Sequence, residues 1–157
     1  VLIDDAGRKI ISGGEFDNAL EDYVIQIVKD GIKIAYKDYS SIWREINTDK
    51  GSQFYANKKD SEGEKGKTEF ELFLEKNNIK HIPSRRNHPQ TNGKNERWFR
   101  TYEENRMKFK TFKEFIDWYN DKIHLGLSRK EGITPNEAIG FKLQPEAILG
   151  LFFRRFV

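Results

Sequence analysis

Two carboxylates, Asp49 and Glu96, are the residues whose types and settings could do chemistry in this 157-residue chain. Asp49 follows a predicted strand and stands in a Gly-containing turn, and Glu96 lies near the start of a predicted basic helix. Two such oxygen ligands suit Mg²⁺ or Mn²⁺, which keep waters and substrate phosphates as their other ligands. Paired ions of this kind act on the attacking and leaving oxygens of a phosphodiester. The alternative is structural, with Asp49 as an ordinary turn residue and Glu96 as a partner of the helix dipole.

The elements that must position these carboxylates follow from the hydrophobic pattern. Residues 1–12 predict a β-hairpin around a turn at 4–8. Apolar residues at three- and four-residue steps predict a helix over 18–38, in which Gly31 is a point where the helix could split. The other expected elements are strands at 42–47 and 79–83, helices at 68–77, 94–108, 111–123 and from 134, a tail helix at 145–153, and polar loops at 57–67 and 84–93. Strands that alternate with helices before helices dominate predict an α/β domain around a mixed sheet.

Several helix starts carry capping signals. Residues 68–71 and 111–114 each have the Thr-x-x-Glu form of a capping box. In residues 134–137 a Pro follows the Thr, which suits the first position of a helix.

Composition excludes several classes of protein. The chain has no Cys, which excludes disulfides, thiolate zinc sites and cysteine nucleophiles and suits a reducing, cytoplasmic location. The apolar stretch at 147–153 is too short to span a bilayer, and no signal peptide is visible. His81, His88 and His124 lack the spacing of a zinc site.

Positive charge is concentrated between residues 80 and 110, the basic segment. It holds nine Lys or Arg and three Glu, a net +6, whereas the remainder holds 19 basic and 22 acidic residues, a net −3. This pattern is expected of a contact with a polyanion, and the alternative is a solvated helix face. The candidate DNA-contacting residues are Arg85, Arg86, Gln90, Asn92, Lys94, Asn95, Arg97 and Arg100. The aromatic residues Trp98, Phe99, Trp118 and Tyr119 are expected in the core rather than as platforms for bases.

Four segments of the chain form a recognisable series, namely residues 2–8 (LIDDAGR), residues 47–54 (NTDKGSQF), residues 88–97 (HPQTNGKNER) and an ending that runs from WYN at 118–120 to TPNEA at 134–138. In this order they resemble segments of retroviral-type integrases and insertion-sequence DDE transposases. The resemblance covers residues 1–140 and leaves 141–157 as a C-terminal helical tail.

The resemblance implies a ribonuclease H-like fold, a mixed sheet flanked by helices, and a DDE-type polynucleotidyl transferase. Asp49 then matches the second catalytic Asp and Glu96 the catalytic Glu, and together they hold paired Mg²⁺ or Mn²⁺ ions. One ion would activate water or a 3′-hydroxyl, and the other would stabilise the departing oxygen. The implied partners are DNA, as element ends and target, and further copies in a homodimer or higher multimer, associated with a prokaryotic nucleoid.

Two departures from the family pattern matter. The family's first catalytic Asp lies on a strand before the hairpin, and we expect that strand to precede Val1 in a longer protein, so that this piece is inactive alone. Asp4 and Asp5 stand in the hairpin instead, where Asp is common in turns, and Asp4 as a substitute ligand is the less favoured alternative. Between Asp49 and Glu96 lie 46 residues, a long spacing whose excess fits the loop at 57–67.

Three alternatives stay open from the sequence. The first is a non-catalytic remnant that binds DNA or dimerises, and the second is a hydrolytic nuclease of the same fold. The third is an unrelated basic interaction domain.

Overall fold

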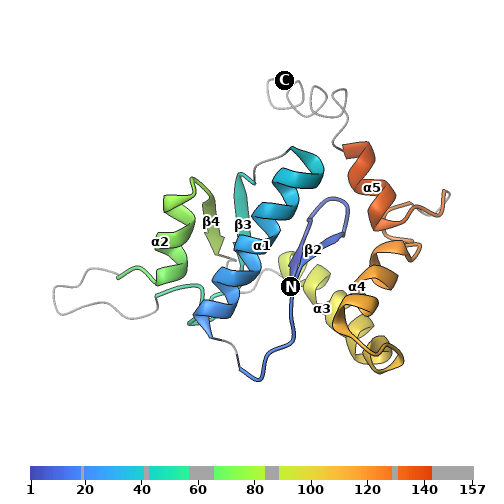
Figure 1. The fold of residues 1–157 in the computed structure, drawn as a ribbon, viewed down its shortest axis with the longest axis horizontal. Helices are drawn as coiled ribbons and strands as arrows, with labels where there is room; N and C mark the ends of the chain where they lie inside the picture. The colour runs from blue at the N-terminus through green and yellow to red at the C-terminus, as the bar shows by residue number, and fades with distance from the viewer. Residues whose placement is uncertain (19, 41–42, 57–65, 84–88, 129–130, 143–157) are drawn as a thin grey trace. The chain divides into compact units, whose positions relative to one another are not determined.

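The computed structural model describes residues 1–157 except 19, 41–42, 57–65, 84–88, 129–130 and 143–157. The protein is a mixed α/β chain whose small sheets are flanked by helices (Figure 1). The elements in chain order are β1 (Leu2–Ile3), β2 (Ile10–Ser12), α1 (Glu21–Tyr39), β3 (Glu45–Thr48), α2 (Glu69–Lys76), β4 (Lys80–Pro83), α3 (Pro89–Asn105), the 3₁₀-helix η1 (Arg106–Lys108), α4 (Phe112–Asp121) and α5 (Pro135–Lys142).

The chain forms two compact units. Unit 1 comprises residues 1–14 and 107–157, and unit 2 comprises residues 15–106. The strands form two sheets of two strands each, β1 with β2 in unit 1 and β3 with β4 in unit 2. No helix in the described residues is long and apolar enough to cross a bilayer.

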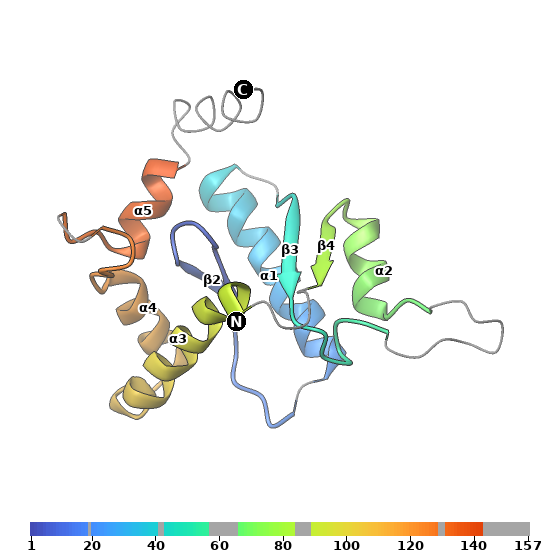
Figure 2. The ribbon, with the colours of Figure 1, turned by 180° about the vertical axis from the view of Figure 1, so that it is seen from behind.

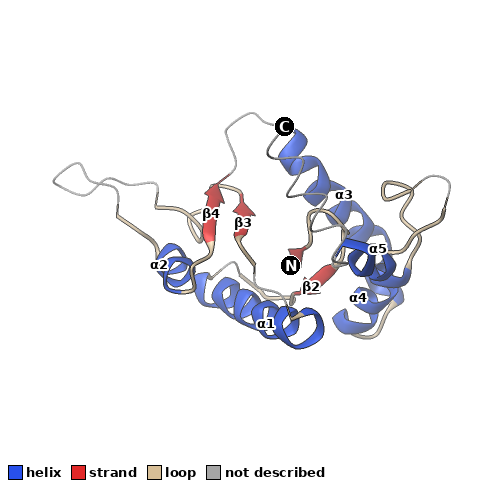
Figure 3. Cartoon of the chain, turned by 90° about the horizontal axis from the view of Figure 1, so that it is seen from above, coloured by secondary structure: helices blue, strands red, loops and turns tan. Residues whose placement is uncertain are grey.

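Unit 2 is built around the parallel pair of β3 and β4, which lie side by side in Figure 2. Glu45 pairs with Lys80, and the register continues to Thr48 opposite Pro83. Helices α1 and α2 lie on one side of this pair (Figure 3). The buried core there consists of Ile25, Val28, Ile46, Phe70, Leu74 and Ile79. Phe70 and Leu74 are fully buried, so α2 contributes the centre of this core.

Helix α1 is one continuous helix with a single buried face. Its buried residues Ile25, Val28, Gly31 and Ala35 recur at three- and four-residue steps, so a single face is buried. Gly31 does not split the helix, and the predicted start at residue 18 is corrected to Glu21, after Leu20 as the N-cap. Helix α2 begins at the predicted capping box, in which Thr68 Oγ1 accepts from Glu71 N and Glu71 Oε2 accepts from Thr68 N.

Unit 1 contains the predicted hairpin. β1 and β2 pair antiparallel across a turn in which Asp4 N donates to Lys9 O at 2.7 Å. The carboxylate of Asp4 accepts a hydrogen bond from Gly7 N within the same turn, so Asp4 serves the hairpin. Phe115 on α4 is fully buried, and Tyr119 packs beside it. Helix α5 begins at Pro135, as predicted, and Thr134 and Glu137 also exchange capping hydrogen bonds, which were not predicted.

Other boundaries differ from prediction. Helix α3 begins at Pro89, five residues before the predicted start at 94, and ends at Asn105. The strand predicted at 42–47 is observed as β3, Glu45–Thr48, and α4 ends at Asp121 rather than 123. The predicted tail helix at 145–153 and most of the loop at 57–67 lie outside the described residues.

Candidate functional site

Asp49 lies directly after the carboxyl end of β3, where the strand passes into a tight turn. Its Oδ1 accepts a hydrogen bond from Gly51 N at 2.9 Å, an arrangement typical of Asp in turns. Phe54 N and Tyr55 N then donate to Gly51 O at 2.9 and 3.1 Å, which closes the turn. The carboxylate of Asp49 is exposed, and it pairs with no Lys or Arg among the described residues.

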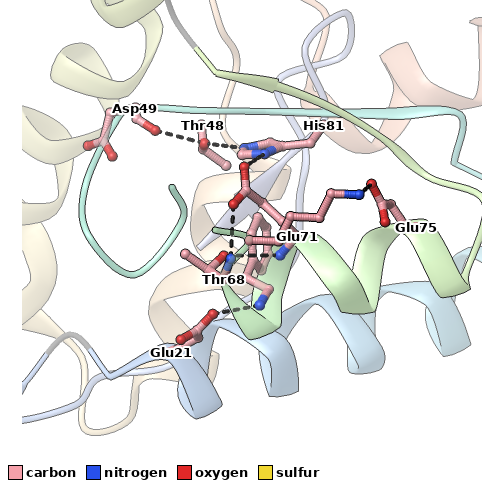
Figure 4. A network of polar contacts seen from close by, with 9 residues as sticks. Glu21, Thr48, Asp49, Thr68, Glu71, Glu75 and His81 are labelled. Carbon is pink, nitrogen blue, oxygen red and sulfur yellow. Dashed lines mark hydrogen bonds and ion pairs between the residues drawn. The ribbon is translucent and has the colours of Figure 1, made fainter. Parts of the chain in front are cut away.

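A chain of polar contacts lies behind Asp49 and joins three elements (Figure 4). Thr48 Oγ1 lies 2.8 Å from the main-chain oxygen of Asp49 and 2.8 Å from His81 Nε2. On the far side of the imidazole, His81 Nδ1 lies 3.7 Å from Glu71 Oε1. Because Glu71 also caps α2, the end of β3 is linked through β4 to the first turn of α2.

Strand register explains why these side chains meet. His81 pairs with Ile46, and successive side chains of a strand alternate between faces, so Thr48 lies on the same face of the sheet as Ile46. That face packs on the helices. The His81 imidazole and the Phe70 ring lie nearly perpendicular to each other, with ring centroids 5.5 Å apart. The side chains of His81 and Glu71 are only 11% and 17% exposed, so this contact is shielded from water.

Glu96 lies on α3 and is exposed. Because α3 begins at Pro89, Glu96 is about two turns into the helix, beyond the first turn in which a helix dipole acts. This placement corrects the expectation that Glu96 is near the helix start, and it weakens the interpretation of Glu96 as a dipole partner. The segment that leads from β4 to α3, residues 84–88, lies outside the described residues, so the convergence of Glu96 with Asp49 stays a prediction.

The candidate DNA-contacting residues fall into three groups. Arg97 and Arg100 are exposed on α3 and lie three residues apart, so they share part of one helix face. Gln90, Asn92, Lys94 and Asn95 belong to the helical backbone of α3, and their side chains are outside the described set. Lys94 and Asn95 were predicted in this helix, whereas Gln90 and Asn92 were predicted in the loop before it. Arg85, Arg86 and His88 lie outside the described residues.

The aromatic residues of α3 divide between core and surface. Trp98 is buried and stacks on Tyr102 with ring centroids 5.4 Å apart, as expected of a core residue. Phe99 is 56% exposed, so its expected place in the core is wrong. In unit 1, Tyr119 is buried, and Trp118 is half-buried with Lys122 Nζ 4.8 Å from its ring centroid.

The C-terminal end of α3 is held by Glu15. Arg106 donates to both Glu15 oxygens, from Nε at 2.5 Å and from Nη2 at 2.8 Å, and the Tyr102 hydroxyl donates to Oε1 at 2.5 Å. The Arg106 hydrogen bonds lower the pKa of Glu15 below its ordinary value, with a smaller contribution from Tyr102. The hydrogen bond to Glu15 raises the pKa of Tyr102. The helix that bears Glu96 is thus fixed at one end by a charge-assisted contact.

The donor chemistry of Asp49 and Glu96 fits a hard divalent cation. Both side chains offer exposed carboxylate oxygens, and neither is neutralised by a described Lys or Arg. Among the described residues there is no group of three or more His, Cys, Asp or Glu that could hold a metal ion.

Sequence reasoning missed Thr48, Glu71 and the role of His81. His81 was noted only as a histidine without zinc spacing. The signal that could have found the contact is the alternation along two strands predicted to lie side by side. Comparisons with models of known protein families, with curated proteins and with solved structures find no match.

Proposed function

We propose that this chain is the ribonuclease H-like core of a DDE-type enzyme that cuts and joins DNA strands. The observation on which the proposal depends is the setting of Asp49, an exposed carboxylate at the end of β3, held by the turn bond to Gly51 and backed by Thr48. The parallel β3–β4 pair, followed by the helix that bears Glu96, agrees with the order of elements that the resemblance implies.

Each group has a defined task in the proposed reaction. Asp49 and Glu96 would hold Mg²⁺ or Mn²⁺, which, when bound, neutralises charge on the phosphate and activates the attacking oxygen. Arg97 and Arg100 bind neighbouring phosphates and orient the strand. In strand transfer, a 3′-hydroxyl oxygen forms a bond to phosphorus while an existing phosphorus–oxygen bond breaks. No covalent enzyme intermediate is required.

The implied partners follow from this chemistry. Joining an element end to a target requires two DNA segments, and a second copy of the chain would present the second end. The basic segment supplies phosphate contacts that do not depend on DNA sequence.

The first test is metal binding by the two carboxylates. We expect Asp49→Asn and Glu96→Gln each to weaken Mn²⁺ binding at least tenfold, measured by titration calorimetry, with unchanged circular dichroism. Asp38→Asn and Glu103→Gln are matched controls, because both residues are exposed carboxylates of unit 2 outside the candidate site. Equal Mn²⁺ affinity in all four variants would contradict the proposal.

The second test separates the alternatives. Mn²⁺-dependent joining of pre-processed DNA ends supports a strand-transfer enzyme, whereas cutting without joining indicates a nuclease. DNA binding without chemistry, in this chain and in one extended upstream by a strand, indicates the non-catalytic remnant.

A further inference from the structure

The hydroxyl of Thr48 has two polar neighbours but only one proton. The main-chain oxygen of Asp49 can only accept a hydrogen bond, so the Thr48 proton goes to it across 2.8 Å. The hydroxyl must then accept in its other contact, which is His81 Nε2 at 2.8 Å. This arrangement requires a proton on Nε2 of His81, which would donate it to Thr48.

The surroundings hold the His81 ring in the orientation that this donation requires. The Phe70 ring packs nearly perpendicular to the imidazole, and Glu71 Oε1 lies 3.7 Å from Nδ1. Glu71 is itself fixed, because its other oxygen accepts from Thr68 N at 3.0 Å in the capping box of α2. A ring held in this way can direct the turn at the end of the neighbouring strand.

We propose that His81 is a positioning residue for Asp49, acting through Thr48. The donated hydrogen bond fixes the Thr48 hydroxyl, which in turn fixes the main-chain carbonyl of Asp49 and hence the turn closed by Gly51 N and Asp49 Oδ1. The direction of the exposed carboxylate is thereby set through His81 on β4 and Glu71 on α2, whose side chains are mostly shielded from water, rather than by the exposed turn alone. The inference rests on the proposed function, since it concerns a carboxylate proposed to hold a cation.

The proton position is tested first, by long-range ¹H–¹⁵N NMR of the His81 ring in the unmodified chain. We expect Nε2 to carry the proton. A spectrum in which Nε2 is unprotonated and only Nδ1 carries a proton would overturn the inference, because the Thr48 proton would then point to His81 and leave the Asp49 carbonyl.

The positioning role is tested with paired variants. We expect His81→Leu, which removes the donor, to speed amide hydrogen exchange at Gly51 and to weaken Mn²⁺ binding, each about three- to tenfold. His81→Gln, which keeps an N–H donor at similar reach, should restore both to within about twofold. Thr48→Val should match His81→Leu, and the double variant should be no worse than either, because both changes break one connected chain of contacts.

A stability control separates positioning from general loosening. Ile79→Val removes a methylene from the buried core of unit 2 without touching the polar contacts, and it should leave exchange at Gly51 unchanged. Gly51 exchange in His81→Leu equal to that of the unmodified chain would overturn the inference. If His81→Leu fails to fold, the ring spectrum and the His81→Gln variant still decide it. If the unmodified chain binds no Mn²⁺, the proposed function fails, while the spectrum and the Gly51 exchange still decide the role of His81.

Discussion

At the scale of single residues, Asn120 satisfies both main-chain polar groups of Ile10. Its Oδ1 accepts from Ile10 N at 2.9 Å, and its Nδ2 donates to Ile10 O at 2.9 Å. Asn120 is 6% exposed and Ile10 is 1% exposed, so water cannot replace either bond. An amide side chain suits this task because it offers one acceptor and two donors in one plane.

Asn120→Ala should therefore destabilise the protein by about 2–4 kcal/mol, because it leaves a buried N–H and a buried C=O without partners. The measurement is urea-induced unfolding followed by circular dichroism. Asn18→Ala, at an exposed position, is the control and should change stability by less than about 0.5 kcal/mol. A loss in Asn120→Ala as small as that of the control would show that the side chain is dispensable.

Little of this residue-level chemistry could be predicted from the sequence. Asp49 was found because its neighbours resemble a known motif, and Glu96 for the same reason. Asn120 was noticed only as part of the WYN segment and had no assigned role. Its contact, like that of His81 with Thr48, joins residues far apart in the chain, and such pairs have no fixed sequence spacing.

At the scale of elements, α3 depends on the contact of its C-terminal end with Glu15. The pKa of Glu15 is lowered from 4.5 by the hydrogen bonds from Arg106, so the folded state favours the ionised carboxylate. The contact stabilises the protein fully above about pH 4.5, and this contribution is lost as pH falls through the lower, folded-state pKa. The pKa of Tyr102 is raised from 10.0, so its contribution is present below that pH and is lost as pH rises through the folded-state value.

We expect Glu15→Gln to lower stability at pH 7 by at most about 1 kcal/mol, since the Glu15 side chain is 38% exposed and solvent screens the pair. The difference from the unmodified chain should shrink as pH falls below 4.5 and vanish once pH is below the lowered, folded-state pKa of Glu15, because the carboxyl is then protonated in both states. Urea unfolding between pH 3 and 7 measures this, with the exposed Glu104→Gln as control. A difference that is the same at all pH values would show that charge on Glu15 is not the cause.

The beginnings of helices were predictable where a side chain caps the first turn. The capping bonds at Thr68 and Thr134 are present, because both partners lie within one turn. At Thr111 only half of the predicted box forms, since Glu114 Oε2 accepts from Lys110 N instead of from Thr111 N. The start of α3 was not predictable from helix propensity, because Asn92 and Gly93 are weak helix formers, and Pro89 at the first helical position is the one local signal for it.

At the scale of the whole molecule, the uneven distribution of charge is the property that bears on the proposed binding of DNA. Arg106 is engaged with Glu15, and its side chain is only 16% exposed, so it is not available to a phosphate. Arg97 and Arg100 are exposed and are thus the described members of α3 best placed to contribute. Contacts of this kind release counterions, so DNA affinity should fall as salt rises.

The double variant Arg97→Gln, Arg100→Gln should reduce the slope of log affinity against log salt by about 2, because each phosphate contact contributes roughly 0.9. Fluorescence anisotropy with duplex DNA at several salt concentrations measures the slope. Lys33→Gln with Lys113→Gln is the charge-matched control, since both side chains are exposed and lie outside the basic segment. An equal loss of slope in the control would mean that only net charge matters.

The α/β class was predictable from the alternation of strand and helix patterns, and the structure confirms it at that level. The assembly of unit 1 from two remote stretches of the chain was not predictable. The hydrophobic pattern of each stretch shows that its apolar face must be covered, but it does not show which other segment covers it. Ile10 illustrates this, since its hydrogen-bond partner is Asn120.

That discontinuity has a consequence for the order of events during synthesis. Residues 15–106 emerge from the ribosome between the two parts of unit 1. Because synthesis proceeds at about 5–20 residues per second, the helix that covers Ile10 is made roughly 5–20 s after the hairpin. During that interval the nascent chain presents an uncovered apolar strand, which is the kind of segment that chaperones hold.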